Sequence, residues 1–256
     1  MSIRAIATVV LFCVTLAGCR GAGAAAAPTA AEAMLASDGG GHAGVYAGID
    51  KARAVTLANL ANADTTGFKR TVAVAGPGGA RLSMAMDQGS LKSTDRPFDV
   101  AINGQGFFRV KHPSAEGGVA YTRNGNLFVN NKNELVIGMG DGLPLVPAVS
   151  VPADSTEVNF SQGGDVQVTR AGQPKRESVG WLMLCLFRSP CDLSEIAPGV
   201  YVETPASGPP IETRARDNGA GEFLQGFLEA SNVDVERERD RLQFLRDWRA
   251  AMRSGR

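Results

Sequence analysis

The sequence has few residues of the types that bind metals or catalyse reactions, and their spacing does not bring them together. The two histidines, His42 and His112, lie far apart in glycine-rich or loop-like stretches, with no cysteine or carboxylate at metal-ligand spacing. The Gly-Pro-Gly-Gly stretch at 76–79 is followed neither by Lys-Ser or Lys-Thr nor by a helical pattern, which indicates a turn-rich linker and not a phosphate loop. We predict no catalytic residue, no metal site and no cofactor, and therefore no enzyme.

Asp99 is the acidic residue with the best claim to a catalytic role. The stretch Phe98–Ile102 alternates apolar side chains with Asp99 and Ala101, which is the period of a half-buried strand. Asn103-Gly104 follows and is typical of a tight turn, so a hairpin centred on these two residues is expected. Because such a strand exposes its polar positions, we expect Asp99 to be a solvated carboxylate.

Cys19 is the residue whose setting predicts a covalent modification. Arg4 precedes an apolar run that is too short to span a bilayer, and the run ends in Leu16-Ala17-Gly18-Cys19. This ending looks like a bacterial lipobox, in which the cysteine is acylated, and each buried methylene of an acyl chain contributes about 0.8 kcal/mol to anchoring. The alternative is an ordinary cleaved signal with an incidental Cys19. Residues 1–19 are thus a predicted signal peptide, and the Ala- and Gly-rich stretch 20–43 a flexible tether.

The composition is typical of a folded chain, and the net charge is zero. Hydrophobic residues make up 44% of 256 residues, enough for a sizeable core. Lys plus Arg and Asp plus Glu both number 26, so no net field attracts nucleic acid or an anionic membrane. Partners must be recognised by shape and by local patches.

Two helices are predicted, one on each side of a β-rich block. The first runs over residues 44–62 with a narrow stripe of mostly small apolar side chains, which suits close packing against another helix. The second starts near Val233 and ends near Arg253. Ser231, Asn232 and Asp234 are all good caps for it, and Ser231 with Asp234 approximates a capping box. Its candidate apolar face includes Leu242 and Leu245, preceded by the charged run 236–241.

Between these helices the pattern is one of short strands separated by turns. Strands are expected over 119–123, 126–130 and 134–137 as a meander, and over 158–160, 166–169 and 179–187, the last buried on both faces. Prolines at 144, 147, 152, 190, 198, 205, 209 and 210 exclude long helices from most of this block. Cys185 and Cys191 fall at its end; either they are bridged, or one is a buried small hydrophobe and the other a loop thiol.

Four segments carry a resemblance to a known family. They are Leu57–Arg70, Gln88–Leu91 with Pro97–Phe108, Tyr121–Gly125, and Gln225–Val235. In this order they resemble the rod and hook proteins of the bacterial flagellum, and Tyr201–Gly208 resembles a segment of the distal rod branch. The sequence departs from the family at Arg239 and Asp240, where apolar residues are usual, and in an abbreviated region between Arg70 and Gln88.

The resemblance implies a mainly β fold, in which a discontinuous β domain is inserted between N- and C-terminal helices that pair as a coiled coil. The implied divisions are a helical segment at 44–68, a β domain at 69–222 and a C-terminal helical segment at 223–256. The resemblance also implies a structural subunit of the basal body that assembles with itself and with other rod and hook subunits. The residues expected at the assembly interfaces are Asn59, Leu60, Asn62, Gly67, Phe68, Ser231, Asn232, Val233, Asp234, Leu242 and Leu245.

The predicted lipid conflicts with the resemblance, because rod subunits of this family carry no cleaved signal. Either translation starts at Met34, or a rod-like body follows a lipoprotein signal. The second case leads to an alternative function. In it, a membrane-tethered lipoprotein accessory uses its rod-like β domain to bind the flagellar rod or another envelope partner. The expected location is the periplasmic part of the basal body, with Cys19 as an anchor in the outer membrane if the signal is used.

Overall fold

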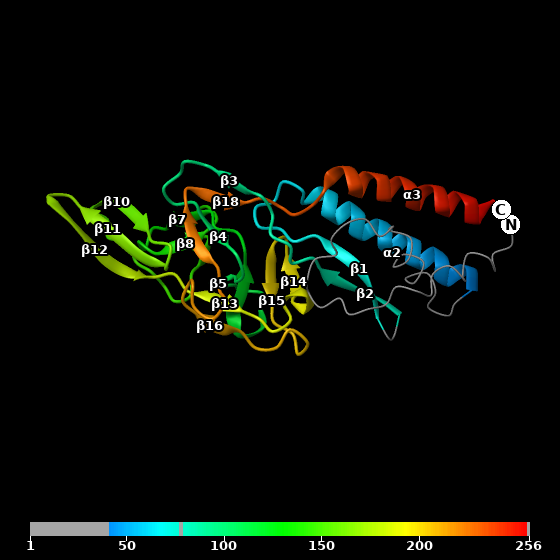
Figure 1. Ribbon diagram of the computed structural model, residues 1–256, viewed down its shortest axis with the longest axis horizontal. Helices are drawn as coiled ribbons and strands as arrows, with labels where there is room; N and C mark the ends of the chain where they lie inside the picture. The colour runs from blue at the N-terminus through cyan, green and yellow to red at the C-terminus, as the bar shows by residue number, and fades with distance from the viewer. Residues whose placement is uncertain (1–40, 77–78, 255–256) are drawn as a thin grey trace. The chain divides into compact units, whose positions relative to one another are not determined.

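The computed structural model describes residues 41–76 and 79–254, which form two compact units (Figure 1). The described part of the first, the helical unit, comprises residues 41–61, 71–76, 79–87 and 234–254. The second, the β unit, comprises residues 62–70 and 88–233. Predictions for residues 1–40, including the signal peptide and Cys19, lie outside the described residues.

The helical unit contains two long helices and one hairpin. Helix α2 (Gly41–Ala61) and helix α3 (Val235–Arg253) lie side by side and antiparallel (Figure 1). Leu245 of α3 packs with Ile49 and Ala52 of α2, and Ala73 and Trp248 border this cluster. Helix α2 begins three residues before the predicted start at 44, and so extends into the predicted tether 20–43.

The hairpin consists of β1 (Thr71–Gly76) and β2 (Gly79–Met84), paired antiparallel. The predicted β domain began at residue 69, yet this hairpin belongs to the helical unit. The reason is local: the side chain of Asn59 bonds the backbone of Thr71, and Ala73 packs on the helix pair. Of the predicted turn-rich linker at 76–79, Gly76 is the last residue of β1 and Gly79 the first of β2, and these two residues pair with each other.

The β unit is built from short strands in several small sheets. Its strands are β3 (Leu91–Ser93), β4 (Val100–Asn103), β5 (Phe108–Lys111), β6 (Val119–Thr122), β7 (Leu127–Val129), β8 (Leu135–Ile137), β9 (Leu143–Pro144), β10 (Ser155–Phe160), β11 (Asp165–Arg170), β12 (Gln173–Trp181), β13 (Leu184–Leu186), β14 (Ser194–Ala197), β15 (Val200–Val202), β16 (Ile211–Thr213), β17 (Glu222–Gln225) and β18 (Phe227–Glu229). Two short 3₁₀ turns, η2 (Glu116–Gly118) and η3 (Pro190–Asp192), interrupt them. The sheet orders are β14-β15-β6-β5, β10-β11-β12, β7-β8-β9, β13-β16, β17-β4 and β18-β3.

The mainly β architecture with one helix before and one after the β unit is as predicted, and β6, β7 and β8 lie close to their predicted bounds. The predicted meander of these three strands is wrong, because β6 pairs with β5 and β15, whereas β7 pairs with β8. Helices α2 and α3 lie side by side. Their pairing as a coiled coil stays a prediction. The predicted strand at 179–187 is two strands, because β12 ends at Trp181, which is partly exposed, and β13 starts at Leu184. Strands β17 and β18 occupy residues 222–229, most of which had been assigned to the C-terminal helical segment.

The hairpin predicted around Asn103-Gly104 is wrong. Strand β4 pairs with β17 near the end of the chain, and β5 pairs with β6. The loop between β4 and β5 is instead bonded to the guanidinium of Arg123, which the turn pattern does not reveal. The prediction of a solvated Asp99 is wrong as well: its exposed fraction is 0%, because Asp99 lies in a bridge with Asn126 beside the buried residues of β4.

Candidate assembly interface

The end of α2 is fixed by Asn59, the first of the predicted interface residues. Its side-chain amide donates to the carbonyl of Thr71 at 2.9 Å and to Oε1 of Glu238 on α3 at 3.2 Å. Its Oδ1 accepts from the Thr71 amide at 2.9 Å. Asn59 therefore joins α2, β1 and α3 within one chain, and its fully buried side chain is unavailable to another subunit.

After α2 the chain turns through residues 62–68. Asn62 accepts from Thr65 through both its carbonyl and its Oδ1, each at 3.1 Å. Gly67 has φ +69°, and a Cβ placed there would lie 2.5 Å from the carbonyl carbon of Arg123. Phe68 follows and is buried. This turn is thus shaped by glycine and packed inside the β unit.

Three charged side chains, Lys69, Arg123 and Glu229, form a buried cluster that we call the charge hub. The Lys69 ammonium lies 2.6 Å from Oε1 of Glu229, and Arg123 donates from Nε to Oε2 of the same carboxylate at 2.7 Å. The backbone amide of Gly89 also donates to Oε1, at 3.0 Å. All three side chains are at most 4% exposed, and Glu229 is at 0%. Burying charges is costly unless each is paired and hydrogen-bonded, and here the carboxylate has several donors.

The guanidinium of Arg123 also holds the loop between β4 and β5. It donates to the carbonyls of Ile102 at 2.9 Å, Gly104 at 2.8 Å and Gly106 at 2.6 Å. Five separate stretches therefore meet at the hub, and they come from all four segments that carry the family resemblance: those around Lys69, Gly89, the 102–106 loop, Arg123 and Glu229. The hub was not predicted from the sequence, although the segments that form it are the ones that carry the family resemblance.

The segment that leads into α3 is bonded to the same region. The Oδ1 of Asn232 accepts from the Arg70 amide at 2.7 Å, and the amide of Asn232 approaches the Phe68 carbonyl at 3.4 Å. Asp234 is the N-cap of α3, and its Oδ1 accepts from the Arg237 amide at 3.1 Å. The predicted capping box of Ser231 with Asp234 is wrong, since Ser231 bonds the Val233 amide instead. Helix α3 starts two residues later than expected, after its real cap.

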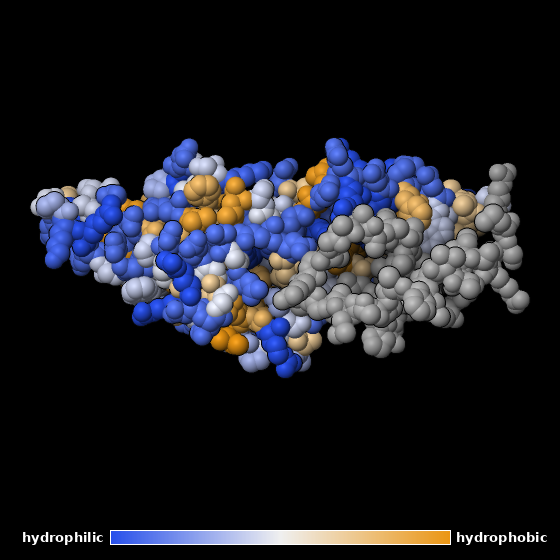
Figure 2. Space-filling model, viewed as in Figure 1, coloured by the Kyte–Doolittle hydropathy of each residue, from blue (hydrophilic) through white to orange (hydrophobic). Residues whose placement is uncertain are grey.

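The predicted interface residues divide into two groups by accessibility. Leu245, Leu242, Gly67, Phe68 and Asn59 are buried within their own unit. Leu60, Asn62, Ser231, Asn232 and Val233 are half-buried, and Asp234 is exposed. Apolar side chains that the analysis did not assign to an interface remain at the surface of the two helices, with Leu57 48% and Phe244 37% exposed. Figure 2 shows apolar patches among the charged side chains over the helical unit.

The titratable groups of the β unit are poorly suited to nucleophilic chemistry. Burial raises the pKa of the Cys185 thiol to about 12, and Cys185 is free, so it is not bridged to Cys191. Burial likewise raises the pKa of Tyr121 to about 12 and raises that of Tyr201, whose oxygen accepts from the Lys69 amide at 3.0 Å. These groups are protonated at neutral pH, whereas a thiolate is the reactive form of cysteine.

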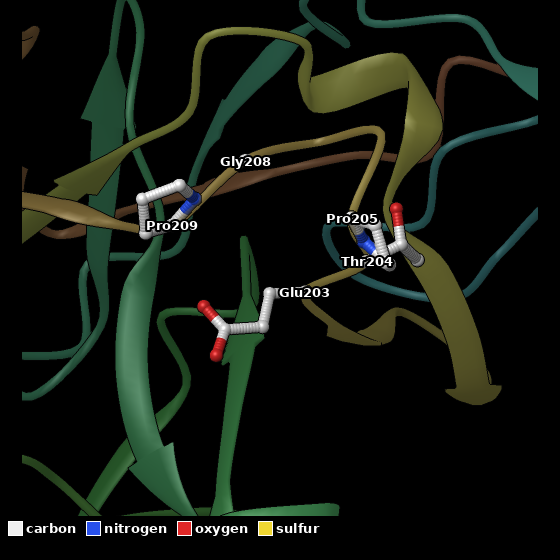
Figure 3. A pocket seen from close by; sticks show the side chains of 5 residues that line it. All are labelled: Glu203, Thr204, Pro205, Gly208 and Pro209. Carbon is white, nitrogen blue, oxygen red and sulfur yellow. The ribbon is translucent and has the colours of Figure 1, made fainter.

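One open groove lies on the β unit between Glu203 and Pro209 (Figure 3). Its volume is about 340 Å³, and Thr204, Pro205 and Gly208 complete its lining. In this view the Glu203 side chain lies below the two prolines, with its carboxylate directed away from Pro205. Within residues 41–76 and 79–254 there is no cluster of three or more His, Cys, Asp or Glu side chains arranged to hold a metal. No helix in this part of the chain is long and apolar enough to cross a membrane.

Comparison with known proteins identifies relatives over most of the chain. The family model described as "Flagellar hook protein FlgE/F/G D1 domain" matches residues 101–168. The "Flagellar basal-body rod protein FlgG" of Buchnera aphidicola subsp. Acyrthosiphon pisum is 37% identical over 209 residues, which cover 70% of this chain and 79% of the relative. The protein of the same name from Caulobacter vibrioides is 33% identical over 210 residues, with the same shares of each chain.

Proposed function

The chain belongs to the flagellar rod and hook protein family, and we propose that it is a structural subunit of the basal-body rod. The observation that carries this proposal is the 37% identity to a flagellar basal-body rod protein over 79% of that protein's length. The names of the relatives favour the rod over the hook, in agreement with the resemblance of Tyr201–Gly208 to the distal rod branch. The protein's work on this proposal is mechanical and not catalytic.

Assembly would use the exposed faces of the helical unit. Leu57 on α2 and Phe244 on α3 are large apolar side chains left at the surface, and Leu60, on the same helix as Leu57, is half-buried. Burying such side chains against other subunits is favourable, at roughly 25 cal/mol per Å² of apolar surface. Contacts between unlike faces of identical subunits generate an open helical assembly when the rotation from one subunit to the next does not close a ring, and a rod would require this case. The charge hub would give each subunit a rigid β unit on which such a lattice depends.

The experiment that tests this proposal is deletion of the gene in its own bacterium, followed by electron microscopy of isolated basal bodies. We expect the null strain to lack complete rods, and the wild-type gene to restore them. Leu57→Asp should fail to restore them because a charge replaces an exposed apolar contact. Met139→Asp is the matched control, because Met139 is 82% exposed on the β unit. A null strain that builds complete rods and hooks would remove the proposal.

A second candidate function is favoured by the sequence Leu16-Ala17-Gly18-Cys19. If Cys19 is acylated, the protein is a membrane-tethered accessory in the periplasm that binds the rod or another envelope partner through its β unit. Mass spectrometry of the N-terminus of the native protein distinguishes the two. An acylated Cys19 favours the tethered accessory, whereas an unmodified chain that starts at Met34 leaves the ordinary rod subunit.

A further inference from the structure

The segment of residues 222–232, which we call the C-terminal strap, completes parts of the β unit that lie far away in sequence. Strand β4, whose residues Val100, Ala101 and Ile102 are all fully buried, has β17 of the strap as its only strand partner in the described part of the chain. Strand β3 likewise pairs only with β18 among the described strands. Without the strap, the most deeply buried strand of the unit would have an open edge, and unpaired buried backbone groups are costly.

Side chains of the strap also complete the core. Phe223 is buried and stacks on Phe108 of β5, with ring centroids 5.7 Å apart. The side-chain amide nitrogen of Gln225 donates to the carbonyls of Pro97 at 2.7 Å and Val158 at 2.9 Å. Its side-chain Oε1 accepts from the backbone amide of Phe160 at 3.0 Å. One strap side chain therefore ties β10 to the chain segment before β4.

Glu229 is the strap's contribution to the charge hub. It pairs with two buried cations, Lys69 and Arg123, that lie 160 and 106 residues earlier. Removing one partner of a buried ion pair leaves the other charge buried and uncompensated, which is strongly destabilising. A β unit that lacked the strap would hold both cations in a buried site without this carboxylate.

We propose that the C-terminal strap is the closing element of the β unit, so that the unit becomes stably folded only when residues 222–232 are present. A chain that is still incomplete therefore presents no finished β unit. The strap is followed by Val233 and then by Asp234, the cap of α3. The proposal concerns folding of the chain itself and stands independently of the function in the rod.

Hydrogen exchange on the intact chain tests the proposal first. Three backbone hydrogen bonds join the strap to the rest of the β unit: they run from the amides of Gly67, Gly226 and Ala230 to the carbonyls of Glu229, Asp99 and Ser90, respectively. If the strap opens only when the whole unit unfolds, these amides share the protection factors of the β5 and β6 amides to within about threefold, at every denaturant concentration. Strap amides that exchange at least about tenfold faster, while β5 and β6 stay protected, would overturn it.

A cut chain tests the proposal a second way. A protease site is inserted in the exposed turn at Asn218-Gly219, the chain is folded and cut, and the two fragments are separated in denaturant. The larger fragment alone should lack the native fluorescence of Trp181 and regain it when the strap fragment is added. A strap fragment with Glu229→Gln should restore this fluorescence only at a concentration at least about a hundredfold higher than the unchanged fragment. A fragment with Glu222→Gln is the control: Glu222 pairs with the mostly exposed Arg216, so the concentration needed should change by no more than about threefold. A larger fragment that keeps the cooperative unfolding transition of the uncut chain contradicts the proposal.

Discussion

The two units of this chain are stabilised by different kinds of contact. The β unit has an extensive apolar core that runs from Val100 to Phe223, together with a buried charge hub of precise geometry. Among the described residues of the helical unit, Ile49, Ala52 and Leu245 form one buried apolar cluster, Val55, Met84 and Leu242 are buried as well, and Asn59 supplies a polar link. The β unit therefore has the larger core, while both units leave large apolar side chains exposed, such as Leu57 and Phe244 on the helices and Met139 and Ile211 on the β unit.

Each unit contains one of the two tryptophans, so the comparison can be measured. Trp181 is the last residue of β12 in the β unit. The guanidinium carbon of Arg214 lies over its ring, 4.4 Å from the ring centroid. Trp248 lies on α3 in the helical unit. Single-tryptophan variants, Trp248→Phe and Trp181→Phe, therefore report unfolding of the β unit and the helical unit separately.

The largest effect is expected from Arg123→Met in the charge hub. The substitution removes the ion pair with Glu229 and leaves three carbonyls without their donor. Breaking a buried pair costs about 3–5 kcal/mol, so urea unfolding followed at Trp181 should shift by that amount while the Trp248 transition moves less. Arg216→Met is the control, because Arg216 is mostly exposed. Equal shifts at both tryptophans would end the distinction between the units.

Gly67→Ala should cost somewhat less and should also act on the β unit. The new Cβ would lie 2.5 Å from the Arg123 carbonyl carbon, at a backbone φ of +69°. A left-handed conformation costs about 1–2 kcal/mol for alanine, and crowding adds about 1–3 kcal/mol. Gly172→Ala isolates the crowding, because Gly172 has φ +76° with open space around it. If the two variants are equally stable in thermal unfolding, the close approach at Gly67 has no energetic weight.

These two sites also show how far the sequence alone could go. Local patterns predicted β7 and β8 because the turn at 131–133 lies between them, and β7–β8 is a hairpin. They failed at β4, because alternation identifies a strand and not its partner, which here is β17 at the far end of the chain. Nothing in the sequence around Glu229 indicates that Lys69 and Arg123 meet it in the core. The four segments that resemble the family could be recognised together in the sequence. That they meet at the charge hub is visible only in the folded structure.

The helical unit should respond most to Leu245→Ala. Leu245 is fully buried between Ile49 and Ala52, and leucine truncation in a core costs about 2–5 kcal/mol. The loss should appear in the unfolding transition followed at Trp248 and not in the one followed at Trp181. Phe244→Ala, one residue earlier and partly exposed, should change the monomer by less than about 1 kcal/mol. A larger effect of Phe244→Ala would place that side chain inside the unit and weaken its assignment to assembly.

A smaller effect is expected from Asp234→Ala at the start of α3. Its carboxylate accepts from the Arg237 amide, and loss of such a cap costs about 1 kcal/mol. The change should destabilise α3 at Trp248, and Asp234→Asn should recover most of the stability because asparagine caps as well. If alanine and asparagine behave alike in urea unfolding, the cap contributes nothing measurable.

The smallest effect at neutral pH, and one confined to the β unit, is expected from Tyr121→Phe. Burial raises the pKa of Tyr121 to about 12, above its ordinary value near 10. Between these values the unfolded chain loses the phenolic proton before the folded chain does, so the stability of the β unit is intact below pH 10 and falls as the pH rises towards 12. Tyr121→Phe should remove part of this alkaline loss at Trp181, while Tyr201, whose pKa burial also raises, keeps the rest. Tyr46→Phe in the helical unit is the control. An alkaline profile at Trp181 that Tyr121→Phe leaves unchanged would mean that the ring stays solvated, and that the β unit is less tightly closed around β6 than its packing implies.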